Sequence, residues 1–345
     1  MLECGRRHRP RTVRLDLSAR LDQIEDTALL SIRASLSVSI AACIAGAALV
    51  GCDGGKSSSK PSERGTQPTL TPSRTVRLAL IRPDGSGLRL LGPTSNFAEA
   101  PSPTWSPDGK RIAFSFQRCP NCPPRISVAL LEGRLRTLPG APVGGDPSWS
   151  PKGDLITYSH KEGVDRELEV LDVARGSASV LRTPENASHP GWFPSGKAII
   201  FAAEVHERLQ LFRVNADGTG QRRLTTSGFY DDPAVSKDGR RIAVACLGKR
   251  QTWDLCMADS HGIRRILRRD GNSRSPAFSP DGRRLVFSSD RGSRAGVRAL
   301  QLLDLKTGRV TVLTTQDVDS GEPDWSPDGE TIVFARRSLI ETASG

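Results

Sequence analysis

A five-residue motif recurs six times at nearly constant spacing, and it constrains the fold more than any other feature of the chain. The copies resemble Trp-Ser-Pro-Asp-Gly and begin at Trp105, Trp149, Trp192, Val235, Phe278 and Trp325. Successive copies start 43 to 47 residues apart, a period typical of proteins built from an array of small sheets. The sequence therefore predicts an all-β repeat architecture.

Residues around each motif predict a strand on either side of a tight turn. Proline, aspartate and glycine within the motif are residues that tight turns favour. The residues seven and nine positions after the start of each motif are mostly large and apolar. In the first copy, which starts at Trp105, they are Ile112 and Phe114. Positions two apart on a strand share a face, so each copy presents a pair of apolar groups to one side.

A second hairpin follows each motif around another glycine turn, so each period contains four strands, enough for one propeller blade. An outer hairpin at Val76–Ile81 and Leu88–Leu91 precedes the first motif, whereas the last motif lacks one. We therefore predict that the N-terminal strands complete the last blade and close a six-bladed β-propeller over residues 75–337. The aromatic anchors are expected to fill the gaps between blades. An open solenoid of the same repeats is the alternative.

The repeats resemble the WD40-like repeat of the TolB β-propeller family, through segments such as WSPDGKRIAFSF from Trp105 and FSPDGRRLVFSS from Phe278. The resemblance covers residues 75–337. It implies the propeller without the N-terminal α/β domain of TolB, for which too few residues precede Val76. Residues 338–345 are expected to form a short tail.

The N-terminal region predicts export. Residues 34–50 carry no charge and are too few for a typical membrane span, but they suit the apolar part of a signal sequence. They run into Leu49-Val50-Gly51-Cys52, which resembles the bacterial lipobox, so lipidation is expected at Cys52. An ordinary secretion signal or a transmembrane anchor is the alternative.

Residues 1–52 are thus expected to hold an N-terminal extension and a lipoprotein-type signal. The acidic residues within Met1–Ala28 do not suit a signal, so we expect translation to start near Leu29–Ile32. Residues 53–74, rich in Ser, Pro and Gly, are expected to form a flexible polar tether. The predicted location is extracytoplasmic, in the periplasm or at the cell surface, with a lipid anchor in the bacterial cell membrane.

Four cysteines follow Cys52. Cys246 and Cys256 are predicted on consecutive strands, and because their midpoint falls in the connecting loop they are expected to face each other in a disulfide. Cys119 and Cys122 flank a Pro-Asn pair at a predicted hairpin tip. A tight-loop disulfide is favoured there over half a zinc site or a redox pair, since no second Cys-x-x-Cys accompanies it.

The formal net charge of +11 favours anionic partners such as lipid headgroups, cell-wall polyanions or acidic proteins. The basic residues are dispersed, and aromatic residues make up only 5% of the chain, so few side chains could stack on bases. We therefore expect no nucleic-acid partner, and a solvated blade rim accounts for most of the charge.

A second proline recurs two residues before each motif, as Pro103 does before Trp105. The residue before this proline is polar and is expected at the mouth of the central channel, where the innermost strands begin. The six are Ser102, Asp146, His189, Asp232, Ser275 and Glu322. Three are acids, which predicts binding of a cation such as calcium or of a basic peptide. The neighbours Glu99, Asp231 and Asp324 are expected to add to an acidic mouth. Turn capping by these side chains is the alternative.

The sequence contains no Gly-x-Ser-x-Gly, no His-Glu-x-x-His and no P-loop motif. We therefore predict a monomeric, membrane-tethered binding or scaffolding propeller, not an enzyme, that engages a protein or cell-envelope partner without a cofactor. The alternative function is a metal-dependent propeller enzyme, similar to a lactonase or lyase, with a cation at the channel mouth.

Overall fold

The fold is described from a computed structural model, which describes residues 71–95, 101–117, 122–140, 142–162, 165–259, 262–269, 271–293, 296–315 and 318–342. Residues 1–70, with the predicted signal, the lipidation site Cys52 and most of the tether, lie outside the described residues, as do Glu99 and Cys119. In this described part of the chain, no helix is long and apolar enough to cross a membrane.

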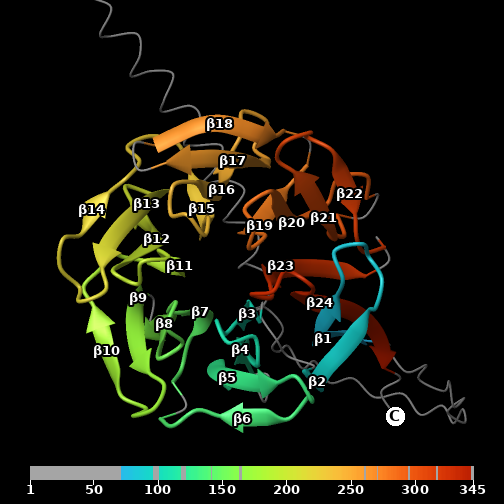
Figure 1. The fold of residues 1–345 in the computed structure, drawn as a ribbon, viewed down its shortest axis with the longest axis horizontal. Helices are drawn as coiled ribbons and strands as arrows, with labels where there is room; N and C mark the ends of the chain where they lie inside the picture. The colour runs from blue at the N-terminus through green and yellow to red at the C-terminus, as the bar shows by residue number, and fades with distance from the viewer. Residues whose placement is uncertain are drawn as a thin grey trace, which may run out of the picture. The chain divides into compact units, whose positions relative to one another are not determined.

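Six four-stranded sheets surround a common centre and form a six-bladed propeller (Figure 1). The innermost strands are β3 (Thr104–Trp105), β7 (Gly145–Trp149), β11 (Ser188–Trp192), β15 (Tyr230–Val235), β19 (Ser273–Phe278) and β23 (Asp319–Trp325). The second strands are β4 (Arg111–Phe116), β8 (Leu155–Glu162), β12 (Ala198–Val205), β16 (Ile242–Leu247), β20 (Arg284–Ser289) and β24 (Ile332–Thr342). The third strands are β5 (Arg125–Leu130), β9 (Asp165–Asp172), β13 (Arg208–Asn215), β17 (Trp253–Asp259), β21 (Ala299–Asp304) and β1 (Thr71–Ile81). The outer strands are β6 (Leu135–Thr137), β10 (Ala178–Leu181), β14 (Arg222–Arg223), β18 (Gly262–Arg268), β22 (Val310–Val312) and β2 (Arg89–Ser95). We number the blades one to six in the order of these innermost strands.

The two ends of the described chain meet in blade six, as predicted. Its strand order is β2-β1-β24-β23, so the first two strands complete the sheet that the last two begin. In Figure 1 the blue β1 lies beside the red β24. Their antiparallel register runs without a break from Thr71 opposite Thr342 to Ile81 opposite Ile332. Both strands therefore extend beyond the predicted limits of 75 and 337, because each supplies backbone partners for the other.

The apolar core is divided among the six seams between neighbouring blades. One cluster lies at each seam, and at the seam between blades six and one it joins Leu78 and Leu80 to Trp105, Ile112 and Phe114. The anchor residue therefore fills the space between blades, as expected. Full burial of a Leu, Ile or Phe side chain stabilises a fold by about 1.5–3 kcal/mol. Because both faces of a blade are covered, second strands such as β12, β16 and β20 are buried almost throughout and lack the alternation of a half-exposed sheet.

The motif turn is held by a repeated hydrogen-bond pattern. In the first copy the Ser106 hydroxyl donates to the Arg111 carbonyl oxygen at 2.9 Å and accepts from the Arg111 amide at 3.0 Å. Gly109 has a left-handed φ of +67°, which glycine adopts without strain. The turns also contact one another around the ring: a Cβ on Gly153 would lie 3.3 Å from Pro107 of the preceding copy. The motif therefore sets the distance between blades as well as the local turn.

A disulfide joins Cys246 on β16 to Cys256 on β17, as predicted, with a Cα–Cα distance of 6.0 Å. The two cysteines are not directly opposite, however. Cys246 pairs with Asp254, and Cys256 pairs with Val244, so the bond runs diagonally across one face of the sheet. The prediction was off by one position because the register centres on residue 250 instead of 251. Since Cys119 lies outside the described residues, its pairing with Cys122 stays a prediction.

Reduction of the Cys246–Cys256 bond should destabilise the propeller. Opening a short loop of this kind lowers the free energy of unfolding by about 2–3 kcal/mol. Urea unfolding of the wild type with and without reductant measures the change. A Cys246→Ala/Cys256→Ala variant is the control, because reductant should shift its midpoint much less. An unchanged wild-type midpoint on reduction would contradict the prediction.

Candidate binding site at the channel mouth

The six predicted mouth residues share one unusual backbone conformation. Their φ angles are all positive, between +39° and +52°, in the left-handed region that few residues other than glycine favour. Where they fall inside an innermost strand, the pairing register shifts at the same point, as it does between Gly145 and Ser148 of β7. The following proline cannot donate to the ladder and is tolerated at such a bulge. The conformation recurs in every blade and so belongs to the repeat, whereas four different residue types occupy the position.

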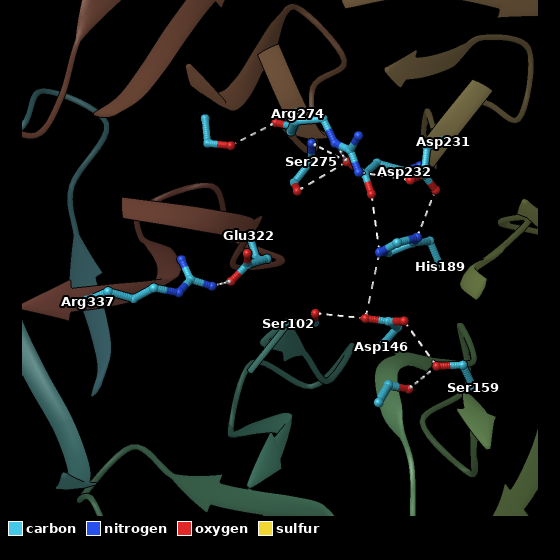
Figure 2. Close-up of polar contacts among 12 residues, drawn as sticks. Ser102, Asp146, Ser159, His189, Asp231, Asp232, Arg274, Ser275, Glu322 and Arg337 are labelled. Carbon is cyan, nitrogen blue, oxygen red and sulfur yellow. Dashed lines mark hydrogen bonds and ion pairs between the residues drawn. The ribbon is translucent and has the colours of Figure 1, made fainter. Parts of the chain in front are cut away.

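All six side chains line one cavity of about 330 Å³ at the centre of the ring. The structure thus brings together Ser102, Asp146, His189, Asp232, Ser275 and Glu322, as the register of the motif predicted. Figure 2 shows that these groups come from all six blades, with Glu322 turned towards Arg337 and away from His189. Their role as ligands of a partner or cation stays a prediction.

His189 lies at the centre of a polar cluster on one side of the mouth. Its Nδ1 is 2.9 Å from Asp231 Oδ1, and its Nε2 lies 3.3 Å from Asp232 Oδ1 and 3.8 Å from Asp146 Oδ1 (Figure 2). The imidazole therefore connects blade two, blade three and blade four. The side chain of His189 is 31% exposed, whereas those of Asp231 and Asp232 are only 7% and 6% exposed. The ring is thus accessible from the cavity while its partners are buried.

The carboxylates of this cluster are held by further donors. Asp146 accepts from the hydroxyls of Ser102 at 2.9 Å and Ser159 at 3.0 Å. Asp231 was predicted as an acidic neighbour, and it forms the closest carboxylate contact of His189. Together these bonds fix the orientation of groups that come from different blades.

Sequence reasoning did not identify Arg274. Its guanidinium donates to Oδ2 of Asp232 at 3.0 Å and to Oδ2 of Asp231 at 2.9 Å, and it lies 4.2 Å from the centre of the Trp253 ring. Arg274 occupies the same position in its blade as Asp231 does in blade four, one residue before the predicted ring. Extending the register comparison by one position would have indicated it.

A second polar group lies on the other side of the mouth. Glu322 pairs with Arg337 of β24, which also contacts Asp319 at 3.4 Å. Arg298 holds both oxygens of Asp319 at 3.1 Å. A Cβ on Gly321 would lie 3.1 Å from the Arg337 guanidinium, so glycine leaves room for this arrangement. No sequence pattern indicated the two arginines, because they lie outside the motif.

The surroundings of His189 set its charge. Burial alone would lower its pKa, but the carboxylates of Asp146, Asp231 and Asp232 raise the pKa of His189 well above its usual 6.5. Burial would raise the pKa of Asp231, but His189 and Arg274 hold it below its usual range. With the imidazole cationic, three carboxylates face two cations, so this side of the mouth keeps a negative excess on a basic protein.

Asp324, predicted as another acidic neighbour, lines the cavity at the seam between blades six and one. Its Oδ2 accepts from the Trp105 amide at 2.8 Å and from the Thr104 hydroxyl at 3.2 Å. The equivalent residues of the other blades, such as Ala234 and Ala277, are small. Burial raises the pKa of Asp324 to about 6, although the hydrogen bonds from Trp105 and Thr104 partly oppose the shift.

A profile of the TolB beta propeller domain matches residues 71–258 and 226–342, which together span most of the chain. The chain belongs to the TolB beta propeller domain family.

Solved structures support the same fold for this TolB-family propeller. A TolB candidate of Agrobacterium tumefaciens superposes with a TM-score of 0.65 at 22% identity, covering 78% of this chain and 100% of that one. TolB of Acinetobacter baumannii gives a TM-score of 0.56 at 20% identity, covering 78% and 65%. At such identities the likeness shows the fold alone.

Sequence relatives of this TolB-family chain differ in their descriptions. An uncharacterized protein of Agrobacterium fabrum is 28% identical over 66% of this chain and 79% of its own length. An uncharacterized peptidase of Bacillus subtilis is 27% identical over 42% of this chain. Dipeptidyl-peptidase 5 of Porphyromonas endodontalis is 30% identical over 33%. The chain spans only 22% and 18% of the lengths of these two peptidases.

Asp324 should make the stability of this TolB-family propeller depend on pH. Its pKa of about 6 in the fold lies above the value of about 3.9 expected for an unfolded chain. A raised carboxyl pKa contributes stability at low pH that is lost as the pH rises through the folded value. The free energy of unfolding of the wild type, relative to Asp324→Asn, should therefore fall by about 1–2 kcal/mol between pH 4.5 and pH 7.

Asp328 is the matched control, since it is an exposed turn residue of the same motif copy. The Ser326 hydroxyl and the Glu330 amide lower its pKa, so its contribution should instead be lost as the pH falls. That loss lies near and below the unfolded-state pKa of about 3.9, so between pH 4.5 and pH 7 the difference in free energy of unfolding between wild type and Asp328→Asn should stay almost constant. Urea unfolding of the wild type, Asp324→Asn and Asp328→Asn across this range measures both differences. If the free energy of unfolding of wild type relative to Asp324→Asn stays constant or grows with pH, the raised pKa of Asp324 is contradicted.

Proposed function

We propose that this chain is an extracytoplasmic, membrane-tethered binding propeller that engages a protein or cell-envelope partner at its channel mouth. The observation that carries the proposal is the convergence of six polar side chains, one from each blade, on a single cavity of about 330 Å³. Concave sites with a few fixed polar groups are where small groups of a partner usually bind.

The charges at the mouth support a cationic group on the partner. Asp146 and Asp232 face the cavity within a cluster that keeps a negative excess, while the chain as a whole carries a net charge of +11. A local acidic site on a basic protein favours a cation that can approach this one face in the correct orientation. A basic side chain or the amino terminus of a peptide would meet carboxylates that neighbouring serines already orient.

Two further observations support the location. The sequence before Cys52 resembles a lipoprotein signal, and the Cys246–Cys256 disulfide is of a kind that forms in oxidising compartments outside the cytoplasm. A lipid on Cys52 would tether the propeller beside a membrane and raise its effective concentration towards envelope partners.

Substitution of the mouth carboxylates should release the partner. Loss of a charge-assisted hydrogen bond costs about 1.5–3 kcal/mol, roughly 10–100-fold in affinity. Covalent capture from envelope preparations, quantified by mass spectrometry, should show that Asp146→Asn and Asp232→Asn each lose one specific protein or envelope polymer that wild type retains.

Asp217→Asn is the matched control, because it removes the same charge from an exposed turn between β13 and β14. This variant should capture the partner as wild type does. Equal capture by all four proteins, with unchanged melting temperatures, would place binding elsewhere on the propeller.

The tether makes a separate prediction. Mass spectrometry of the mature N-terminus should identify a lipidated Cys52, and a Cys52→Ser variant should move from the membrane fraction to the aqueous phase of a detergent partition. The disulfide and the melting temperature of the propeller should not change. An unmodified residue 52 in a membrane-bound protein would contradict lipid anchoring.

A further inference from the structure

We propose that a cavity between blades one and two, on the face of the ring opposite the mouth, binds a small apolar molecule that carries one anionic group. This inference goes beyond the proposed function, because none of the described residues that line this cavity also lines the channel mouth. The size of the cavity, the contact that holds its walls and the charges at its rim support this class of ligand.

The cavity has a volume of about 600 Å³, within the range of about 300–1,000 Å³ that is typical of small-molecule sites. It lies where β4 and β8 begin, and each of these strands follows a motif turn. Each innermost strand runs from beside a mouth residue to such a turn, so the cavity lies on the face opposite the mouth. Exposed residues such as Ala174 line its rim and leave it open to solvent.

The walls of the cavity are held by a close contact between the two blades. Leu138 and Pro139, which follow β6, line it from blade one, and the turn between β9 and β10 lines it from blade two. A Cβ on Gly140 would lie 2.7 Å from the Gly176 carbonyl oxygen, and a Cβ on Gly176 would lie 2.9 Å from the carbonyl carbon of Pro139. Because only glycine fits on both sides of this contact, the walls are in place before a ligand binds.

The floor of the cavity is apolar. Val128 and Leu138 belong to the core cluster of this seam, and they are only 1% and 5% exposed. Leu155 and Val173 also line the cavity and are partly exposed. An apolar ligand that covers these side chains removes its own surface and theirs from water, which favours binding.

The charged residues at the rim favour an anion. They are Arg111, Arg136, Asp154, Asp172 and Arg175. Both carboxylates already accept hydrogen bonds from groups of their own turns. Asp172 accepts from the amide and the guanidinium of Arg175 at 2.8 and 2.6 Å, and Asp154 accepts from the Ser150 hydroxyl at 2.7 Å. With three arginines and two engaged carboxylates, the rim keeps a positive excess.

Arg136 supplies the charge that no neighbour balances. It lies on β6 opposite Val128 and is exposed. Within the part of the chain that the structure describes, it forms no ion pair, whereas Arg111 pairs with Asp108 at 3.1 Å and lies 4.7 Å from the centre of the Trp149 ring. A carboxylate or sulfonate beside Arg136 would gain a charge-assisted hydrogen bond while the apolar part of the same molecule covers the floor.

The test is competition for a fluorescent apolar anion, 8-anilinonaphthalene-1-sulfonate, bound to the full chain. Octanoate should displace the probe, whereas octylamine, which has the same apolar chain and the opposite charge, should not. Ala174→Trp should abolish the displaceable signal, because it places a large side chain at the rim of the cavity. Arg136→Gln should weaken the affinity for octanoate by roughly 10–100-fold, as expected for the loss of a charge-assisted hydrogen bond.

Two matched controls should bind octanoate as wild type does. Lys306→Trp places the same side chain at the position equivalent to Ala174 in the turn between β21 and β22 of blade five. Arg134→Gln removes the same charge from the hairpin that carries Arg136, but Arg134 pairs with Glu132 and does not line the cavity.

Melting temperatures establish that each variant is folded. Displacement by octylamine as effective as that by octanoate would overturn the proposal, as would octanoate binding that Ala174→Trp leaves unchanged. Absence of a displaceable probe from wild type would do the same, and the cavity would then be only a gap in the packing between blades. Since these variants leave the mouth residues unchanged, either result is independent of partner capture by Asp146 and Asp232.

Discussion

Pairing of β1 with β24 is the interaction on which the rest of the propeller depends. It joins residues more than 250 positions apart in a register that runs from Thr71–Thr342 to Ile81–Ile332. Without it, blade six would lack its outer half and the ring would present two open edges. With it, each blade has two neighbours, and each apolar face finds a partner at a seam. The position of the central cavity follows from that closure.

The same closure explains how the mouth can hold strained backbone. A residue such as His189 or Glu322 with a left-handed φ costs free energy, and the conformation persists because the strands on both sides determine it. Every blade repeats this arrangement, so the ring delivers six side chains to one place whatever their identity. Chemistry at the mouth can therefore vary through six positions while the fold stays constant, which fits the separation of site from scaffold in many repeat folds.

The sequence predicted the features that repeat and missed those that do not. Blade number, ring closure, the inter-blade anchors and the six mouth positions all follow from one periodic register. The pairing of Arg274 with two aspartates and the salt bridge of Arg337 with Glu322 do not, because each joins residues whose contact depends on side-chain reach between strands. The disulfide between Cys246 and Cys256 also shows that the sequence pattern predicts which strands are neighbours but not their detailed register. A loop of known length fixes which strands meet, but the hydrogen bonds of Gly248 and Gln251 within the turn decide the register by one residue.

The place where the chain enters the ring has a mechanical consequence. Any pull on the chain before Thr71 reaches the propeller through β1, the strand that completes blade six. Force along that strand loads eleven consecutive residue pairs in shear, all at once, instead of opening them one after another. A closure of this kind resists tension best when the force runs along the strand. The strand that seals the ring would thus also bear its load.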